Sequence, residues 1–235
     1  MGFYRGPNLV TDGLVLNLDA GNTKSYPGSG TVWRDLSGNN NSGSLVNGPT
    51  FSSTNYGSIV FDGVDDYVNL GNSTSITTFS QLTVNAWVNP YSFPAAFNQG
   101  RVIIRGNDSY ILYWYANSSN ASDNKLYFYS PDIEPNLASA VGYLTSNFTT
   151  NTIYNICGTY NGSSTNLYIN GSVVATSTGK SGVITGSLNI SIGSTSAGDG
   201  YYLQGAVHNI QLYNRALSAS EIQQNYNAQK SRFNL

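Results

Sequence analysis

Along most of the chain, apolar and polar residues alternate in short runs that are separated by Gly, Asn, Ser and Pro. Alternation with a period of two is typical of half-buried antiparallel strands, and no helical period of similar length interrupts it. The pattern therefore predicts an all-β protein, folded as an antiparallel two-sheet sandwich or jelly roll. The strands are expected over residues 14–20, 58–63, 66–71, 82–90, 101–106, 110–117, 125–131, 153–162, 165–171, 187–194 and 205–214.

One helix is predicted near the C-terminus. Ser218 precedes Glu221 by three residues, which is the spacing of a capping box. Ile222 and Tyr226 then share one helix face, because they are four residues apart. We expect the helix to lie across a sheet edge or on the end of the sandwich. The chain would thus comprise an N-terminal arm (1–12), a sandwich (13–217) and a C-terminal helix with its tail (218–235).

Tight turns and strand register can also be predicted. The turn in "FDGVDDYVNLG" (61–71) should join two paired strands and leave Phe61 buried. In the last strand, a spacing of two residues places His208 on the same side as Ile210 and Leu212. We expect Ile210 and Leu212 to face the core, with His208 at the sheet end or partly buried and hydrogen-bonded. Three dipeptides favour the positive φ of tight turns: Asp62-Gly63, Asn161-Gly162 and Asn170-Gly171.

Composition narrows the classes of function. Charged residues are only 9% of the chain, against roughly 25% in an average globular protein, and the net charge is −2. No Lys/Arg cluster occurs, so the electrostatic signature of a nucleic-acid-binding protein is missing. No apolar run approaches 18 residues and no N-terminal apolar segment precedes a cleavage site, so we predict neither a membrane span nor a standard secretion signal. The single cysteine, Cys157, lies in an apolar strand and is expected in the core.

Three stretches carry a resemblance to a known family. "CGTYNGSSTNLYINGSVVATS" (157–177), "YLQGAVHNIQLYNRALSASEI" (202–222) and the early hairpin-like "FDGVDDYVNLG" resemble the laminin-G-like, concanavalin-A-type jelly roll. The resemblance implies this fold but does not fix a function. Residues 13–43 and 224–235 resemble segments of such domains in tailed-phage and other viral structural proteins. This implies a virion surface protein made in the host cytoplasm, either a capsid decoration subunit or a fibre head, with other virion proteins as partners.

Two oxygen-rich segments are candidates for a cation. Ca²⁺ takes six to eight oxygen ligands, and the resemblance implies that such a site would lie at the sandwich rim. The hairpin-like segment offers several aspartates, but they are also the residues that a turn requires. The loop "RDLSGNNNSG" (34–43) is the stronger candidate, with Asp35, Asn39 and Asn41 as Ca²⁺ ligands. Its alternative interpretation is an Asx-turn-rich loop without an ion.

The sequence favours a protein without enzymatic activity. Glycoside hydrolases that share this jelly roll carry catalytic carboxylates on alternate residues of one strand. The nearest match, "PDIEP" (131–135), has only Asp132 and Glu134, and its flanking prolines disfavour a central strand. His208 is the only histidine, and a strand histidine in an alternating pattern is more often structural than a general base. A glycoside hydrolase is therefore the weakest alternative.

Tyrosines provide the candidate binding surface. Alternation places Tyr113 and Tyr115 on one face of their strand, and Tyr127 and Tyr129 on one face of the next. Such rings suit sugars, including host surface glycans, and they equally suit protein interfaces. A lectin or receptor adhesin is therefore the alternative to a decoration subunit. Ordinary packing, with one face in the core and the other at the surface, is a third possibility.

Aromatic residues at both chain ends suggest an assembly. Phe3, Tyr4 and Phe233 lie outside the predicted strands, and apolar residues at chain ends need something to cover them. We expect these ends to dock onto neighbouring copies in a homo-oligomer, first of all a trimer, or onto another virion protein. The alternative is that they fold back onto their own sandwich.

Overall fold

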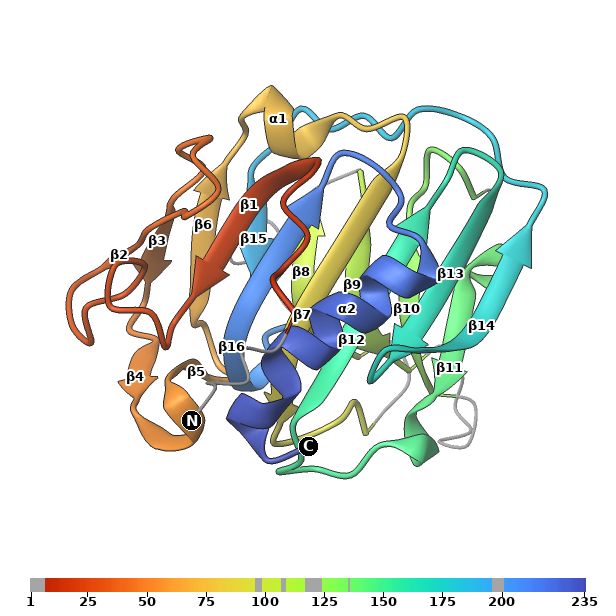
Figure 1. Cartoon of the computed structure of the whole chain (residues 1–235). Coiled ribbons are helices and arrows are strands. Elements are labelled where there is room, and N and C mark those ends of the chain that lie inside the picture. The colour runs from red at the N-terminus through yellow and green to blue at the C-terminus, as the bar shows by residue number, and fades with distance from the viewer. Residues whose placement is uncertain (1–6, 96–98, 107–108, 117–123, 135, 196–200) are drawn as a thin grey trace, which may run out of the picture.

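Two β-sheets pack face to face and one C-terminal helix crosses the outer face of one of them, as the computed structural model in Figure 1 shows. The structure describes residues 7–95, 99–106, 109–116, 124–134, 136–195 and 201–235. Of the helices in these ranges, none has the length and apolar content that crossing a bilayer requires. The predicted all-β sandwich with a short C-terminal helix is confirmed.

Each sheet contains eight described strands, and every pairing between them is antiparallel. The spatial order in sheet A is β14 (Ser172–Thr178), β13 (Ser164–Ile169), β12 (Tyr154–Tyr160), β7 (Leu82–Pro90), β16 (Gln204–Tyr213), β5 (Ser58–Asp62) and β4 (Thr50–Ser52), and β1 (Leu14–Asp19) also pairs with β16. The order in sheet B is β11 (Val141–Leu144), β10 (Lys125–Tyr129), β9 (Ile111–Tyr115), β8 (Gly100–Gly106), β15 (Ile190–Ile192), β6 (Tyr67–Gly71), β3 (Gly43–Val46) and β2 (Val32–Trp33).

The helical segments are short and lie around the sandwich. The α-helices are α1 (Thr74–Thr77) and α2 (Ala219–Gln229), and the 3₁₀ turns are η1 (Thr54–Tyr56), η3 (Leu137–Ser139), η4 (Thr145–Asn147) and η6 (Lys230–Phe233). The sequence pattern located most of the long strands but missed β2, β3, β4, β11 and β14. Four of these have only two to four residues, and β14 is an edge strand with little burial, so their alternation is weak.

The main core lies between the two sheets. Along β7, Val84, Ala86 and Val88 point inward, and Leu112 and Trp114 of β9 face them from sheet B. All five side chains are fully buried. The period of two that is visible in the sequence therefore corresponds to the inner face of each strand. Cys157 is buried as predicted, but it packs with Ile222 of α2 on the outer side of sheet A rather than in this core, and burial raises the pKa of its thiol.

The Asn-Gly turns have the predicted backbone. Asn170 and Gly171 both have positive φ, +51° and +78°, and they form the two-residue connection between β13 and β14. Gly162, with φ of +93°, lies in the hairpin loop between β12 and β13. There the side chain of Asn161 accepts hydrogen bonds from the backbone N–H groups of Ser163 and Ser164.

The segment "FDGVDDYVNLG" does not form the predicted hairpin. β5 belongs to sheet A and β6 to sheet B, so residues 63–66 form an arch between the sheets. Phe61 is fully buried, as predicted, and Val68 enters the same core from the other sheet. The buried carboxylate of Asp66 accepts a hydrogen bond of 3.0 Å from the backbone N–H of Asp62. The prediction was wrong because a turn dipeptide specifies a change of direction but not the sheet that the next strand joins.

The predicted capping box begins helix α2. The side chain of Ser218 accepts from the N–H of Glu221, and the carboxylate of Glu221 accepts from the N–H of Ser218. The helix does not lie at a sheet edge, however, but across the outer face of sheet A, over β7, β12 and β16 (Figure 1). Trp87 explains this position, because its indole points out of β7 and stacks on Tyr226 at 5.6 Å between ring centroids.

The C-terminal tail packs on its own chain. Phe233 is buried and stacks on Trp87 at 4.4 Å, and Arg232 forms an ion pair of 2.8 Å with Asp19. The expectation that Phe233 docks onto a neighbouring copy or another virion protein was wrong. The alternative, that the tail folds back onto its own sandwich, is confirmed for Phe233, because Trp87 provides an apolar surface within the same chain. Phe3 and Tyr4 lie outside the described residues.

His208 does not share the core side with Ile210 and Leu212. The register of β16 against β7 shifts between Val207 and Asn209, so His208 is the extra residue of a β-bulge. Its ring therefore lies against Phe233 on the outer side, at 4.9 Å between centroids. The expectation that His208 is buried and hydrogen-bonded is confirmed, since Nδ1 lies 2.8 Å from the carbonyl oxygen of Gly57.

We predict that Phe233→Ala lowers the free energy of unfolding by about 3 kcal/mol, because it removes a buried ring from Trp87. Leu235→Ala is the matched control, since Leu235 is 48% exposed two residues further on, and it should cost less than about 0.5 kcal/mol. Urea denaturation measures both. Equal stability of the two variants would show that the tail does not stabilise sheet A.

We also predict that His208 makes the fold sensitive to mild acid. Burial lowers the pKa of His208 from 6.5 to about 4, so the unfolded chain binds a proton in this window and the native chain does not. Stability should be fully present above pH 6.5 and fall by about 3 kcal/mol as the pH drops to 4. His208→Asn, whose amide can donate to Gly57, should remove this loss. Denaturation of the unmodified protein and of His208→Asn at several pH values tests this prediction, because the carboxylates contribute equally to the stability of both. Parallel curves of stability against pH would refute it.

Candidate functional site

The four predicted tyrosines lie together on the outer face of sheet B. β9 and β10 pair antiparallel with Tyr113 opposite Tyr127, and Tyr115 and Tyr129 continue the same face. The intervening side chains, such as Trp114, fill the core between the sheets, so alternation leaves the tyrosines on the other side. We call this set of four the tyrosine face.

The rings of the tyrosine face contact one another. The ring centroid of Tyr113 lies 5.3 Å from that of Tyr115 and 6.1 Å from that of Tyr127. Tyr201, from the segment before β16, meets Tyr115 edge to face at 5.7 Å. Tyr113 and Tyr127 are buried, whereas Tyr115 and Tyr129 are half-buried and accessible to a ligand. Tyr201 could not be predicted from the pattern of the sequence, because it lies in no alternating run.

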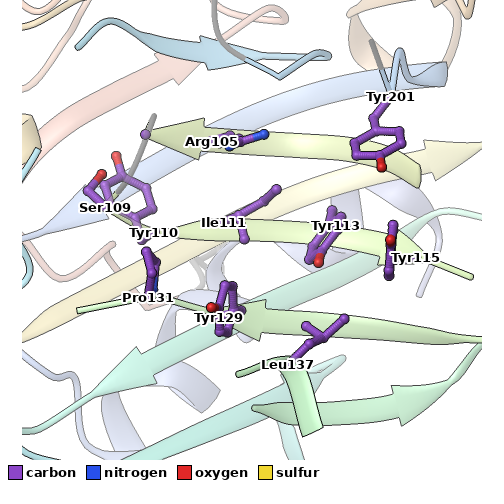
Figure 2. A pocket seen from close by; sticks show the side chains of 11 residues that line it. Arg105, Ser109, Tyr110, Ile111, Tyr113, Tyr115, Tyr129, Pro131, Leu137 and Tyr201 are labelled. Atoms are coloured by element: carbon purple, nitrogen blue, oxygen red, sulfur yellow. The ribbon is translucent and has the colours of Figure 1, made fainter. Parts of the chain in front are cut away.

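A cavity of about 310 Å³ opens on this face (Figure 2). In Figure 2, the rings of Tyr113, Tyr115 and Tyr201 stand at one end of the cavity and Ser109 at the other. Arg105 and Ile111 lie between these two ends. Tyr129, Pro131 and Leu137 stand on the side of β10. The lining of this cavity is mainly aromatic and aliphatic, and its described residues include one cation and no carboxylate. These residues are Arg105, Gly106, Ser109, Tyr110, Ile111, Tyr113, Tyr115, Tyr129, Pro131, Leu137 and Tyr201.

The phenol groups of the site stay protonated at neutral pH. Burial, together with the interaction with Tyr201, raises the pKa of Tyr115 to about 12. Burial also raises the pKa values of Tyr113 and Tyr129. Each hydroxyl can therefore both donate and accept a hydrogen bond. The site combines flat apolar ring faces, neutral hydroxyls and one guanidinium, which suits a ligand with both C–H faces and hydroxyl groups.

The nearby carboxylates do not form an acid/base pair in this site. Glu134 is fully buried and lies 3.3 Å from Nζ of Lys180, and it also accepts hydrogen bonds from Thr165 and from the N–H of Ser130. Burial raises the pKa of Glu134, and Lys180 opposes that shift. Asp132 is exposed and accepts from the N–H of Thr185 instead. Asp132 and Glu134 lie outside any described strand, as the prolines predicted.

The loop predicted to bind Ca²⁺ is organised by its own hydrogen bonds. The carboxylate of Asp35 accepts from the N–H groups of Asn17, Ser37 and Asn41 and from the hydroxyl of Ser37. Asn39 donates to the carbonyl of Leu14, and the side chain of Asn41 bonds Ser75 and the carbonyl of Val15. A cation would have to displace several of these bonds. The Ca²⁺ site at Asp35, Asn39 and Asn41 stays a prediction that this geometry does not favour.

The three aspartates of the arch lie close together. One carboxylate oxygen from each of Asp62, Asp65 and Asp66 lies within 4.8 Å of the others. Burial and the two neighbouring carboxylates raise the pKa of Asp66. One of its oxygens already holds the N–H of Asp62, so the geometry is that of a closed turn.

Solved structures with this fold include binding domains and multidomain enzymes. Domain 4 of AbnA, a GH43 extracellular arabinanase from Geobacillus stearothermophilus solved with arabinotriose, gives a TM-score of 0.63 at 14% identity over 91% of this chain and 98% of that one. The binding domain of Paraclostridial Mosquitocidal Protein 1 gives 0.69 at 18% identity over 93% of this chain and 52% of that one. Trypanosoma rangeli sialidase in complex with sialic acid gives 0.62 at 17% identity over 94% and 33%. The chain thus spans about half of the toxin domain and a third of the sialidase, and the likeness shows the fold alone.

A family model shows the family to which the chain belongs, which the solved structures alone do not. No curated protein sequence matches it. The laminin-G-type model described as the concanavalin A-like lectin/glucanases superfamily matches residues 62–223, which is more than half of the chain and includes the arch, the tyrosine face and the start of α2. The chain therefore belongs to the concanavalin A-like lectin/glucanases superfamily.

Proposed function

We propose that this protein is a non-enzymatic carbohydrate-binding protein that holds glycans on the tyrosine face. The observation that carries the proposal is the cavity of about 310 Å³ on the outer face of sheet B, with the accessible rings of Tyr115 and Tyr129 at its sides. Its size lies at the lower end of the range for small-ligand sites, which is roughly 300–1,000 Å³. A short segment of an oligosaccharide fits this scale.

The chemistry of the lining favours a sugar over a purely apolar ligand. Ring faces can pack against the C–H groups of a pyranose or furanose, while the phenol hydroxyls pair with its hydroxyls. Arg105 adds donors that suit a hydroxyl or a carboxylate. The neighbouring arabinanase domain was solved with arabinotriose, and the toxin neighbour is described as a binding domain, which supports a glycan as the ligand class.

The absence of carboxylates among the described lining residues supports binding without hydrolysis. Most glycoside hydrolases use two carboxyl groups, one on either side of the scissile bond. Glu134, near Tyr129, is committed to Lys180 and Thr165. The glycans that bind should accordingly be recovered intact after prolonged incubation with the protein.

We further propose that the protein acts on a virion surface, as a decoration subunit or fibre head that contacts host glycans. The support is the resemblance of residues 13–43 and 224–235 to segments of viral structural proteins. Peptide mass spectrometry and antibody labelling of purified particles test this location, and particles without the protein would refute it. The predicted trimer is tested independently by light scattering.

We predict that Tyr115→Ala and Tyr129→Ala each weaken glycan binding about tenfold, because each removes an accessible ring from the cavity wall. An array that includes arabino-oligosaccharides and sialylated glycans identifies the ligand, and calorimetry then measures affinity. Tyr129→Phe should retain most of the binding, since the ring remains. Tyr67→Ala, a half-exposed tyrosine on β6 outside the cavity, is the matched control. A blank array, or equal affinity of all variants, would refute the proposal.

A further inference from the structure

A second cavity, of about 250 Å³, lies on the opposite sheet from the tyrosine face. Its floor is the outer face of sheet A, where Ala206 of β16 pairs with Asn89 of β7 and Val60 of β5. Ser58 and His208 also line the cavity, and Thr54 and Asn55 of η1 form another wall. The small side chain of Ala206, between the longer side chains of Asn89 and Val60, leaves room for the cavity.

Two hydrogen-bond acceptors on the residues of this cavity are buried without donors. The carbonyl of Gly57 can only accept, so Nδ1 of His208 carries the proton and Nε2 is a bare acceptor. Within the described part of the chain, neither Nε2 of His208 nor Oδ1 of Asn89 has a hydrogen-bond partner. Buried polar atoms in native proteins are usually paired, so these two atoms mark a part of the wall that the chain's own hydrogen bonds do not close.

The rest of the lining is neutral. It provides the hydroxyls of Ser52, Thr54 and Ser58 and the amides of Asn55 and Asn151, and no described residue that lines it is acidic or basic apart from His208. His208 is uncharged at pH 7, because burial lowers its pKa to about 4. The closest charges, Arg232 and Asp19, neutralise each other at 2.8 Å. A charged ligand would find no counter-charge here.

The wall of the cavity also offers a flat surface. Tyr91 is 38% exposed and follows β7 directly, so its ring is accessible beside Asn89. The volume corresponds to about eight water molecules at ~30 Å³ each, which is far more than a single structural water needs. The dimensions suit one small ligand rather than an extended chain.

We propose that this cavity is a second ligand site, which takes one neutral polyhydroxyl unit such as a single sugar residue. Hydroxyl groups of the ligand pair with the hydroxyls and amides that line the cavity, while its C–H face rests on Tyr91. The proposal goes beyond the tyrosine face and does not depend on it, because the two cavities lie on opposite sheets and share no residue. One chain would then hold two sugars facing in opposite directions, which would let it bridge two glycans.

NMR titration at pH 7 tests the site, with glycerol and the methyl glycosides of glucose, galactose, mannose and arabinose as probes. We expect at least one probe to shift the His208 imidazole and Asn89 amide signals, with a Kd of about 1 to 10 mM. Tyr91→Ala should weaken this at least tenfold. Ala206→Leu, which fills the cavity floor, should abolish it. Tyr56→Ala, an exposed tyrosine outside this cavity, is the matched control and should leave the titration unchanged.

Each other outcome overturns the proposal. His208 signals that do not respond to any probe, or that respond equally in Tyr91→Ala, would show that no such site exists. A variant without residues 1–6 tests whether the chain's own N-terminus is the ligand of the cavity. Binding of the probes to this variant alone would show that it is. Signals of Tyr115 and Tyr129 report the tyrosine face in the same experiment. If the Tyr115 and Tyr129 signals do not respond to any sugar while the His208 signals do, the proposed function is refuted and this second site stands.

Discussion

Burial of sheet A on both faces is the constraint on which much of the structure depends. Trp87 projects from the central strand β7 away from the inter-sheet core, and an exposed indole there would be costly. Helix α2 and the tail cover it through Tyr226 and Phe233. Once Phe233 is fixed, Arg232 reaches Asp19 and the carbonyl of Tyr56, which ties the C-terminus to the segment that holds His208.

The two sheets therefore differ in what their outer faces can do. The chain's own helix covers the middle of the outer face of sheet A, and a small neutral cavity opens at the end of this face near Tyr91. Among the described residues no α-helix covers the outer face of sheet B, which presents Tyr115 and Tyr129 around a larger cavity. The same sandwich thus offers a broad aromatic surface on one side and a polar pocket on the other.

The low charge content is matched by neutral hydrogen bonding inside the fold. Under the helix, Nδ2 of Asn155 donates to Oδ1 of Asn85, and Nδ2 of Asn85 donates to Oε1 of Gln211. These amides are buried on adjacent strands, where unpaired charges would be far more costly to desolvate. Charge is concentrated instead at a few pairs, such as Arg215 with Glu221 at the start of α2.

The sequence by itself determined the features that depend on neighbours a few residues away. Alternation defined the strands and put Tyr113 and Tyr115 on one face, and the spacing of Ser218 and Glu221 predicted the helix start. Tertiary structure alone decided which sheet each strand joins, where the helix lies and where Tyr201 meets the tyrosine face. It also decided the bulge that turns His208 outward. Local spacing sets the direction of a side chain along one element, whereas these outcomes are set by contacts between residues far apart in the chain.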